Sequence, residues 1–348
     1  MSTQPTSSPV RTDEPILSGK VVVCLTEFDQ TTFFPGPLFD RLLTLAPHAR
    51  VIRPNGKDSF ELGRQLDELQ PEVVVGGWST PRLPEKLPPA LKYLCFLCGS
   101  VKAITSRRHL ENGLQVTNWG GSISRTIAEA ALHHILACLR RSPHWTLEMH
   151  VQRGWREPTM EGISLFGLTV GLHGFGRVSR ALIRLLQPFD VKLKVYAPDA
   201  DVRAGRMFGF TPVDSLEALF SGSDVVVELA PLIPETTGIV QERHLRLLPS
   251  GGVFVNVARG AIVDEAGLVR VAKEGCIRFG LDVFTTEPLA TEHPLRGLSN
   301  VYLTPHIAGP TANCCRDVGE FALSNLRRFA AGEELKALVT PETYDQST

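Results

Sequence analysis

Residues 168–199 read LTVGLHGFGRVSRALIRLLQPFDVKLKVYAPD, and this stretch decides the fold. Its apolar opening predicts a strand that ends at His173, and Gly174, Phe175 and Gly176 then turn directly into a helix. Small residues at such a turn let backbone N–H groups approach an anion at the helix N-terminus, where the helix dipole favours negative charge. The stretch therefore predicts a dinucleotide-binding site.

The residues after this turn qualify the prediction. Arg177 opens the expected helix and could add a charge-assisted contact to a phosphate. Ser179 stands where the G-x-G-x-x-G pattern has its third glycine, and serine is small enough for the helix to pack closely on the strand. The sequence therefore still predicts a strand, a tight turn and a helix, although serine replaces the third glycine of the pattern.

The ribose end of the expected site is less regular. A carboxylate is expected about 20 residues further on, at the tip of the next strand, where it binds the ribose diol. That tip is Ala197, and Asp199 and Asp201 lie just beyond it. Both aspartates would repel a 2′-phosphate, which favours NAD over NADP. The alternative is that both are solvated turn residues.

Strand and helix patterns alternate along most of the chain. Short β-branched runs separated by segments with helical spacing indicate parallel sheets with helices on both faces, an α/β fold. One series lies before residue 118, a second begins at Leu168, and residues 124–141 and 311–333 have helical spacing. The expected strands lie in residues 21–25, 50–54, 72–78, 92–99, 114–118, 168–174, 192–197, 224–230, 252–258, 277–284 and 300–309.

Composition is that of an ordinary globular protein. Of 348 residues 43% are hydrophobic and 21% charged, and 36 Lys and Arg against 37 Asp and Glu leave a net charge of -1. This balance gives no electrostatic reason to expect nucleic acid or a membrane as a partner. Residues 1–15, rich in Ser, Thr and Pro, are expected to be a flexible leader without the apolar core of a signal peptide. We therefore expect a cytoplasmic protein.

The number and placement of the cysteines are typical of a protein in a reducing compartment. Seven are scattered through mostly apolar runs, which indicates reduced, buried thiols rather than a disulfide framework. Cys95 and Cys98 form a C-x-x-C, but this motif lies in an apolar run with no second pair and no histidine at ligand spacing. No metal site is expected.

Polar groups follow several of the later strands. Arg259 follows the strand in VFVNVARGAIVDE, Asp282 and Glu287 follow the strand in GLDVFTTEPL, and His306 follows the strand in VYLTPHIAG. Each alone could be a surface pair, a helix cap or a core hydrogen bond. Ligands of open α/β sheets collect at the carboxyl ends of the strands, so the joint placement of these groups predicts one active site.

Five motifs in order carry a family resemblance: GLTVGLHGFGRV, APLIPETTGIV, VNVARGAIVDE, LDVFTTEPL and LTPHIAGPT. With them the chain, from about Lys20 to Ala337, resembles the D-isomer-specific 2-hydroxyacid dehydrogenases, which include phosphoglycerate, glycerate/hydroxypyruvate and D-lactate dehydrogenases. The resemblance implies an NAD-dependent enzyme that interconverts a D-2-hydroxy acid and its 2-oxo acid by hydride transfer.

The resemblance also implies residue roles. Arg259 would bind the substrate carboxylate and polarise the carbonyl, His306 would be the acid/base, and Glu287 would support His306. A guanidinium fork suits a carboxylate, and histidine side chains exchange protons near neutral pH. The implied cofactor contacts are Gly174, Phe175, Gly176, Arg177, Val178, Asp199, Pro231, Val257, Ala258, Asp282 (which would hold the nicotinamide carboxamide) and Gly309, and the implied substrate contacts are Gly99, Ser100, Val101 and Arg259.

The implied architecture is two Rossmann-like, doubly wound domains. Both chain ends, residues 1–118 and 308–348, would form a flavodoxin-like substrate domain, with an NAD-binding domain, residues 119–307, inserted between them. The helix around residues 127–139 would pack on its equivalent in a homodimer.

The chain departs from the family pattern at several positions. Residues 98–102 read CGSVK where the family usually has G-x-G-x-D, so Lys102 replaces an acid. Backbone N–H groups of Ser100 and Val101 could still cradle a carboxylate. Ile123 stands where the family has an asparagine.

Other interpretations stay open. An NAD(H)-binding sensor, like the corepressors that share this fold, could keep the same residues with little turnover, although the chain lacks their long disordered tails. A relative acting on formate or phosphite is a third possibility. Trp78 and Trp119 either shape an apolar substrate pocket or are packed anchors, and Arg107 and Arg108 with Lys102 either hold a second anionic group or form a solvated face.

Overall fold

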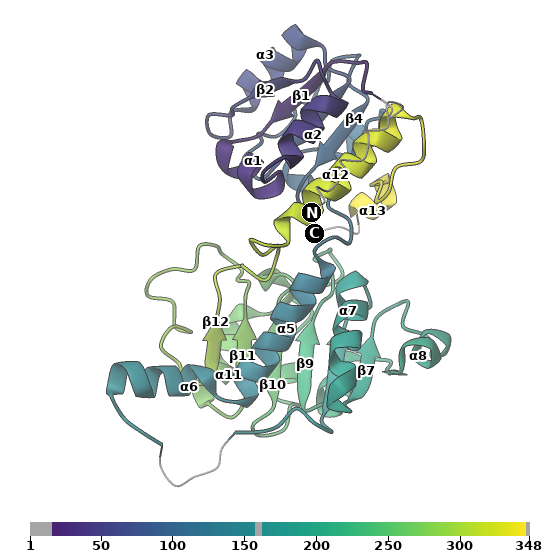
Figure 1. The fold of residues 1–348 in the computed structure, drawn as a ribbon. Helices are drawn as coiled ribbons and strands as arrows, with labels where there is room; N and C mark the ends of the chain where they lie inside the picture. The colour runs from purple at the N-terminus through teal and green to yellow at the C-terminus, as the bar shows by residue number, and fades with distance from the viewer. Residues whose placement is uncertain (1–15, 157–161, 346–348) are drawn as a thin grey trace, which may run out of the picture. The chain divides into compact units, whose positions relative to one another are not determined.

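The computed structural model describes residues 16–156 and 162–345, which form two compact units, shown in Figure 1. Unit 1 contains the described residues up to Ser122 together with Cys315–Asp345, and unit 2 contains Ile123–Cys314. The leader expected in residues 1–15 lies outside the described residues.

The first boundary between the units lies after residue 122, four residues later than the expected 118. The second lies after residue 314, seven residues later than the expected 307. Local hydrogen bonds explain both shifts. The Trp119 amide donates to Cys98 O at 3.2 Å, which ties the first segment to unit 1. The Ala308 amide donates to a carboxylate oxygen of Asp282 at 2.9 Å, which ties the second segment to unit 2.

Unit 1 contains a five-stranded parallel sheet in the order β2-β1-β3-β4-β5. All residues of β1, β3 and β4 are buried, as expected for central strands covered on both faces. Its strands are β1 Val21–Cys24, β2 Arg50–Ile52, β3 Val73–Gly76, β4 Tyr93–Phe96 and β5 Gln115–Thr117. Its helices are α1 Glu27–Phe33, α2 Leu38–Leu45, α3 Ser59–Leu69, η1 Val101–Ala103, α4 Arg107–Glu111, α12 Cys315–Ala330 and α13 Pro341–Asp345.

The helix near the chain end, α12, packs on α1 in unit 1. A Cβ at Gly319 would lie 1.9 Å from Phe33 O, so only glycine permits this approach. Phe329 stacks on Tyr93 of β4 with ring centroids 4.9 Å apart. The helix begins at Cys315, later than the helical pattern from residue 311 predicts.

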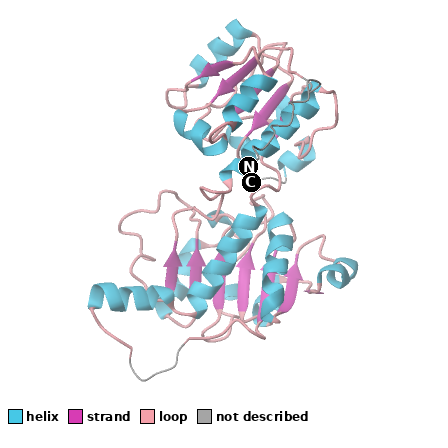
Figure 2. Ribbon diagram, viewed as in Figure 1, coloured by secondary structure: helices cyan, strands magenta, loops and turns pink. Residues whose placement is uncertain are grey.

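Unit 2 contains a seven-stranded parallel sheet in the order β12-β11-β10-β9-β6-β7-β8, whose aligned strands are visible in Figure 2. The chain runs outward from β6 in both directions, so the order reverses between β6 and β9, the place where ligands bind in such sheets. Its strands are β6 Thr169–His173, β7 Lys192–Tyr196, β8 Thr211–Pro212, β9 Val225–Glu228, β10 Val253–Asn256, β11 Arg278–Leu281 and β12 Val301–Leu303.

Helices cover both faces of this sheet. Val225 and Val227 of β9 join a core with α5 and α7, while Val226 joins a core with α9 and α11 on the other face. The helices are α5 Ser124–Leu139, α6 Ser142–Thr146, η2 Leu147–Gln152, α7 Arg177–Leu186, η3 Gln187–Phe189, α8 Val202–Phe208, α9 Leu216–Ser221, α10 Glu242–Leu245, η4 Gly260–Ile262 and α11 Glu265–Glu274. The predicted α/β fold with two parallel sheets is confirmed.

The cysteines are free thiols, as expected, but not all are buried. Cys276 is exposed and Cys314 is half-buried, because both lie in segments outside the strands and helices. Burial raises the pKa of Cys95 to about 11, which makes it a structural rather than a reactive thiol. Within residues 16–156 and 162–345 no helix is long and apolar enough to cross a membrane, and the same residues contain no cluster of three metal-ligating side chains.

Candidate active site

The last residues of five neighbouring strands in unit 2 lie directly opposite one another. Tyr196, His173, Glu228, Asn256 and Leu281 are registered partners in β7, β6, β9, β10 and β11. Registered residues of parallel strands point to the same face, so the polar side chains among them form one row along the carboxyl edge. The loops that follow this row carry the candidate site.

The nucleotide turn is built as its sequence predicts. Gly174 has φ +98°, and a Cβ there would lie 2.8 Å from Ala230 N, so glycine is required on both counts. Gly176 caps α7, and no atom lies within 4 Å of a Cβ built on it. The first N–H groups of a helix lack intrahelical partners, so this open helix end fits a phosphate of a dinucleotide.

Side chains around the turn hold it in place. The Ser179 hydroxyl donates to Gly174 O at 2.8 Å, so serine at the third glycine position braces the turn. Phe175 is buried between Phe208 and Phe210, which leaves only its backbone to contact a ligand. Arg177 and Val178 begin α7.

The two aspartates beyond β7 have different surroundings. Asp201 caps α8 by accepting a hydrogen bond from Ala204 N at 2.7 Å. Asp199 is exposed, and its nearest cation is Arg180 at 3.8 Å. Asp199 is therefore the carboxylate more available to a ribose.

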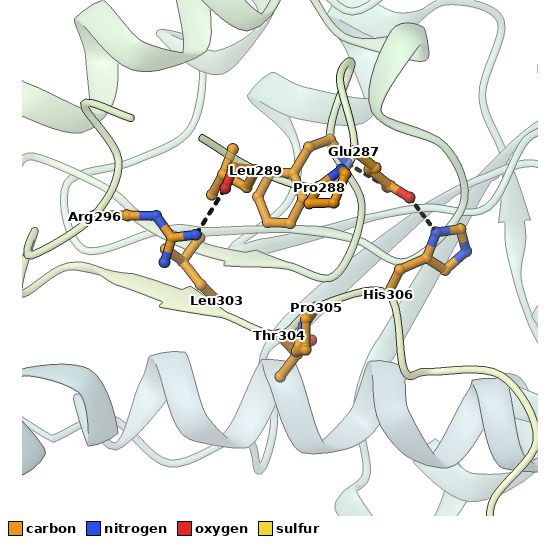
Figure 3. Close-up of a pocket in the computed structure, with 9 residues that line it drawn as sticks. Glu287, Pro288, Leu289, Arg296, Leu303, Thr304, Pro305 and His306 are labelled. Atoms are coloured by element: carbon orange, nitrogen blue, oxygen red, sulfur yellow. Dashed lines mark hydrogen bonds and ion pairs between the residues drawn. The ribbon is translucent and has the colours of Figure 1, made fainter. Parts of the chain in front are cut away.

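Glu287 and His306 lie side by side at one end of a pocket, and a dashed line joins them in Figure 3. His306 Nδ1 lies 2.6 Å from one carboxylate oxygen of Glu287, and the other accepts a hydrogen bond from Phe284 N at 3.0 Å. The His306 side chain is 46% exposed, so its outer nitrogen is accessible. They line a cavity of about 640 Å³ whose other walls are mostly apolar, formed by Phe284, Pro288, Leu289, Arg296, Leu303, Thr304 and Pro305.

Asp282 holds the backbone that carries His306. It is fully buried, and its carboxylate accepts hydrogen bonds from Thr304 Oγ1 at 2.5 Å and from the amides of Ile307 and Ala308 at 2.9 Å each. The Asp282 carbonyl also accepts from the His306 amide at 2.8 Å. His306 has φ +56°, a strained value for a non-glycine residue that these four bonds maintain.

Arg259 lies on the neighbouring loop. Asn256, the end of β10, accepts from Ala258 N and donates to Arg259 O, both at 3.0 Å, and so fixes the backbone at the arginine. Burial lowers the pKa of Arg259, and the negative charge of nearby Glu287 partly offsets this effect. Glu287 and His306 are thus in contact, and Arg259, also in unit 2, lies near enough to Glu287 for the two charges to interact.

Gly260 permits this assembly. A Cβ there would lie 2.0 Å from the carbonyl carbon of Phe284 and 2.4 Å from Thr285 N, so two backbones meet at this point. Gly260→Ala is expected to lower the free energy of unfolding by about 1–3 kcal/mol through overpacking. Urea denaturation measures this loss. Gly309→Ala is the matched control because Gly309 has open space around it, and equal stability of the two variants would contradict the close packing.

The remaining site residues divide between the units. Val257 is buried, and Pro231, Ala258 and Gly309 lie in loops after β9, β10 and β12 in unit 2. The expected substrate contacts Gly99, Ser100 and Val101 lie in unit 1, where Ser100 precedes η1 and Val101 is buried.

The loop of unit 1 is fixed by its neighbours. Asn118 Nδ2 donates to Gly99 O at 2.8 Å, and a Cβ at Gly99 would lie 2.6 Å from the Trp119 ring, so this tryptophan covers the loop. Trp78 packs on buried Phe33 with ring centroids 4.6 Å apart and is 38% exposed.

Two of the three basic residues near this loop, Lys102 and Arg107, have partners. Lys102 Nζ approaches Asp345 O at 3.5 Å, and Arg107 pairs with Glu111 and with Asp345 at 3.1 Å. These contacts favour a structural role over the second anion site considered from the sequence.

Sequence reasoning missed the side chains that hold the loops. Asn256 and Thr304 lie inside motifs that were recognised, but only the structure shows their bonds. His173 and Glu228 were visible as ionisable residues at the ends of two apolar strands, which is the signal that could have singled them out.

Comparisons with known proteins show which family the chain resembles. The family model described as "D-isomer specific 2-hydroxyacid dehydrogenase, NAD binding domain" matches residues 132–308. A glyoxylate reductase of Thermofilum pendens is 34% identical over 236 residues, which cover 67% of this chain and 70% of that protein.

The chain belongs to the D-isomer-specific 2-hydroxyacid dehydrogenase family. A D-3-phosphoglycerate dehydrogenase of Methanocaldococcus jannaschii is 31% identical over 309 residues, 88% of this chain and 58% of that protein. The crystal structure of a glyoxylate reductase from Paecilomyes thermophila superposes with a TM-score of 0.79 at 23% identity, covering 94% of this chain and 100% of that chain, a likeness of fold. The predicted family, enzyme class and NAD(H) cofactor are confirmed: this dehydrogenase is an NAD(H)-dependent oxidoreductase acting on 2-hydroxy acids.

Proposed function

We propose that this dehydrogenase reduces a small 2-oxo acid to the D-2-hydroxy acid, and catalyses the reverse reaction, through Arg259, Glu287 and His306. The observation that carries the proposal is the 2.6 Å contact of Glu287 with His306, close to Arg259 at the carboxyl edge of the sheet. An acid/base pair beside a cation is what carbonyl reduction needs.

Each of these residues has a distinct task. Arg259 binds the substrate carboxylate with its planar fork and draws electron density from the reacting carbonyl. His306 donates a proton from its outer nitrogen to the carbonyl oxygen during reduction and accepts it back during oxidation. Glu287 orients the imidazole and stabilises its protonated form. NADH, when bound, supplies the hydride to the carbonyl carbon.

The cofactor would be held by the residues around the nucleotide turn. The helix end at Gly176 faces open space and suits the diphosphate, and exposed Asp199 suits the adenosine ribose. Asp282 already accepts four hydrogen bonds from groups within the protein, three at its carboxylate and one at its carbonyl. Its contact with the nicotinamide carboxamide therefore stays a prediction.

Substrate class is supported by the relatives and by the loop of unit 1. The relatives named above are glyoxylate and D-3-phosphoglycerate enzymes. We propose that the backbone at Gly99, Ser100 and Val101 contacts the substrate carboxylate. We also propose a cytoplasmic homodimer in which α5 packs near its equivalent, which sedimentation analysis tests.

A substrate screen tests the proposed function. NADH oxidation at 340 nm is followed after adding glyoxylate, hydroxypyruvate, pyruvate or phosphohydroxypyruvate, and the screen is repeated with NADPH. Turnover of at least one 2-oxo acid, with NADH preferred, is expected. Tight NADH binding without turnover of any of them would favour the sensor interpretation instead.

A further inference from the structure

A buried acid–base pair lies directly beside the nucleotide turn, and the mechanism does not use it. His173 Nδ1 is 2.6 Å from Glu228 Oε2, and the two residues are 4% and 0% exposed. The His173 ring stacks on Tyr196 with centroids 5.6 Å apart. Burying two ionisable side chains costs free energy unless each of them is paired and hydrogen-bonded, so a role for this pair is sought in its contacts.

The pair is bonded to the backbone of the nucleotide site from two sides. The second oxygen of Glu228 accepts from Ala230 N at 2.8 Å, and this peptide is the one against which Gly174 packs. His173 immediately precedes Gly174, its carbonyl accepts from Leu229 N at 2.9 Å, and Gly174 N donates to Tyr196 O at 2.8 Å. The Glu228 side chain is therefore bonded to the peptide against which the turn packs, and the His173 side chain holds Glu228 in that position.

We propose that Glu228 and His173 are positioning residues of the cofactor site, and that the proton on His173 balances the Glu228 carboxylate beside the nucleotide turn, so that losing this proton weakens NADH binding. The inference rests on the cofactor site proposed above. With the proton present the pair is neutral. Without it, a buried negative charge remains near a ligand that carries two phosphates, and a low-dielectric interior screens that repulsion weakly.

The direction of the pH effect follows from the surroundings of the imidazole. Burial disfavours the imidazolium, but the charge and hydrogen bond of Glu228 outweigh burial and raise the pKa of His173. The proton is therefore held below about pH 6.5, the ordinary histidine value, and is lost as the pH rises through the higher pKa of the folded protein.

The other charged groups of the segments that adjoin this face are exposed to solvent. Tyr196 is the other titratable side chain in contact with the ring. The exposed acidic groups of the adjoining segments are Asp199 after β7, Asp214 and Glu217 at the start of α9, and Glu235 after β9, and the adjoining cations are Arg177 and Arg180 on α7.

Two variants test the proposal with opposite expected results. NADH dissociation constants are measured by fluorescence from pH 6.5 to 10 without substrate. For the unaltered protein the Kd is expected to rise about three- to tenfold over this range. Glu228→Gln keeps an acceptor for Ala230 N but removes the charge, so its Kd for NADH should stay near the low-pH value of the unaltered protein. At pH 10 this variant should therefore bind NADH more tightly than the unaltered protein does. His173→Gln should bind weakly at every pH, because it leaves Glu228 uncompensated.

Glu217→Gln is the matched control. Glu217 pairs with another buried histidine of unit 2, His244, at 3.0 Å, and the charge that raises the pKa of His173 is that of Glu228, so this variant should keep the pH dependence of the unaltered protein. The KM for NADH should follow the Kd in all variants while kcat changes little, whereas simple structural damage would weaken binding by Glu228→Gln at every pH. A Kd independent of pH, or an unchanged pH dependence in Glu228→Gln, would overturn the inference while leaving the proposed function intact. Absence of NADH binding at any pH would overturn both.

Discussion

His306→Ala is expected to lower kcat by about 10²–10⁴-fold, the usual contribution of a positioned acid or base. The imidazole is accessible on its outer side and held by Glu287 at 2.6 Å on its inner side. Alanine removes the proton donor, and water in its place is neither oriented nor supported by Glu287. NADH binding should change little, since the nucleotide turn lies on other strands. Steady-state kinetics and NADH fluorescence measure the two effects separately.

A matched control separates chemistry from general damage. His48→Ala removes an exposed histidine of unit 1 and should keep turnover within about twofold of the unaltered enzyme, as surface substitutions usually do. If His306→Ala also retained near-normal turnover, His306 would have no part in proton transfer.

Arg259→Lys is expected to lower kcat/KM by about 10²–10³-fold, the cost of removing one preorganised electrostatic group from an active site. The charge is kept, but an ammonium cannot bind a carboxylate through two parallel hydrogen bonds. Arg259 Nη1 also donates to Ala258 O at 2.7 Å, so the guanidinium is anchored to its own loop and a lysine would lose this orientation. Kinetics at varied 2-oxo acid concentration measure the loss.

Arg270→Lys on α11 serves as the control. Arg270 is exposed and pairs with Glu242 at 2.8 Å, so the same chemical change there should leave kcat/KM nearly unchanged. An unchanged kcat/KM for Arg259→Lys as well would contradict substrate binding by Arg259.

The sequence predicted the fold class and the strands well because the signals were local. Apolar β-branched runs and the small residues of the nucleotide turn report burial and backbone geometry directly. The start of α12 was misplaced by a few residues, since residues 311–314 have a compatible composition but lie outside the helix. The packing of that helix on α1 depends on the contact of Gly319 with Phe33, two residues far apart in the chain.

The sequence motifs predicted which residues belong to the site, but not how their side chains and loops are held in place. Arg259, Glu287 and His306 could be named because they follow strands within recognisable segments. The contact of Asp282 with the cofactor stays a prediction, but the bonds of its carboxylate to Thr304, Ile307 and Ala308 were not foreseen. Such bonds join residues about 25 positions apart and depend on loop conformations that no local pattern encodes.

A crystal structure of the dehydrogenase soaked with NADH and oxamate, an unreactive 2-oxo acid mimic, tests the central claim most directly. The account predicts the Arg259 guanidinium on the oxamate carboxylate and the outer nitrogen of His306 within hydrogen-bonding distance of the carbonyl oxygen, both beside the nicotinamide ring. Oxamate and nicotinamide bound with those two side chains turned away would contradict it.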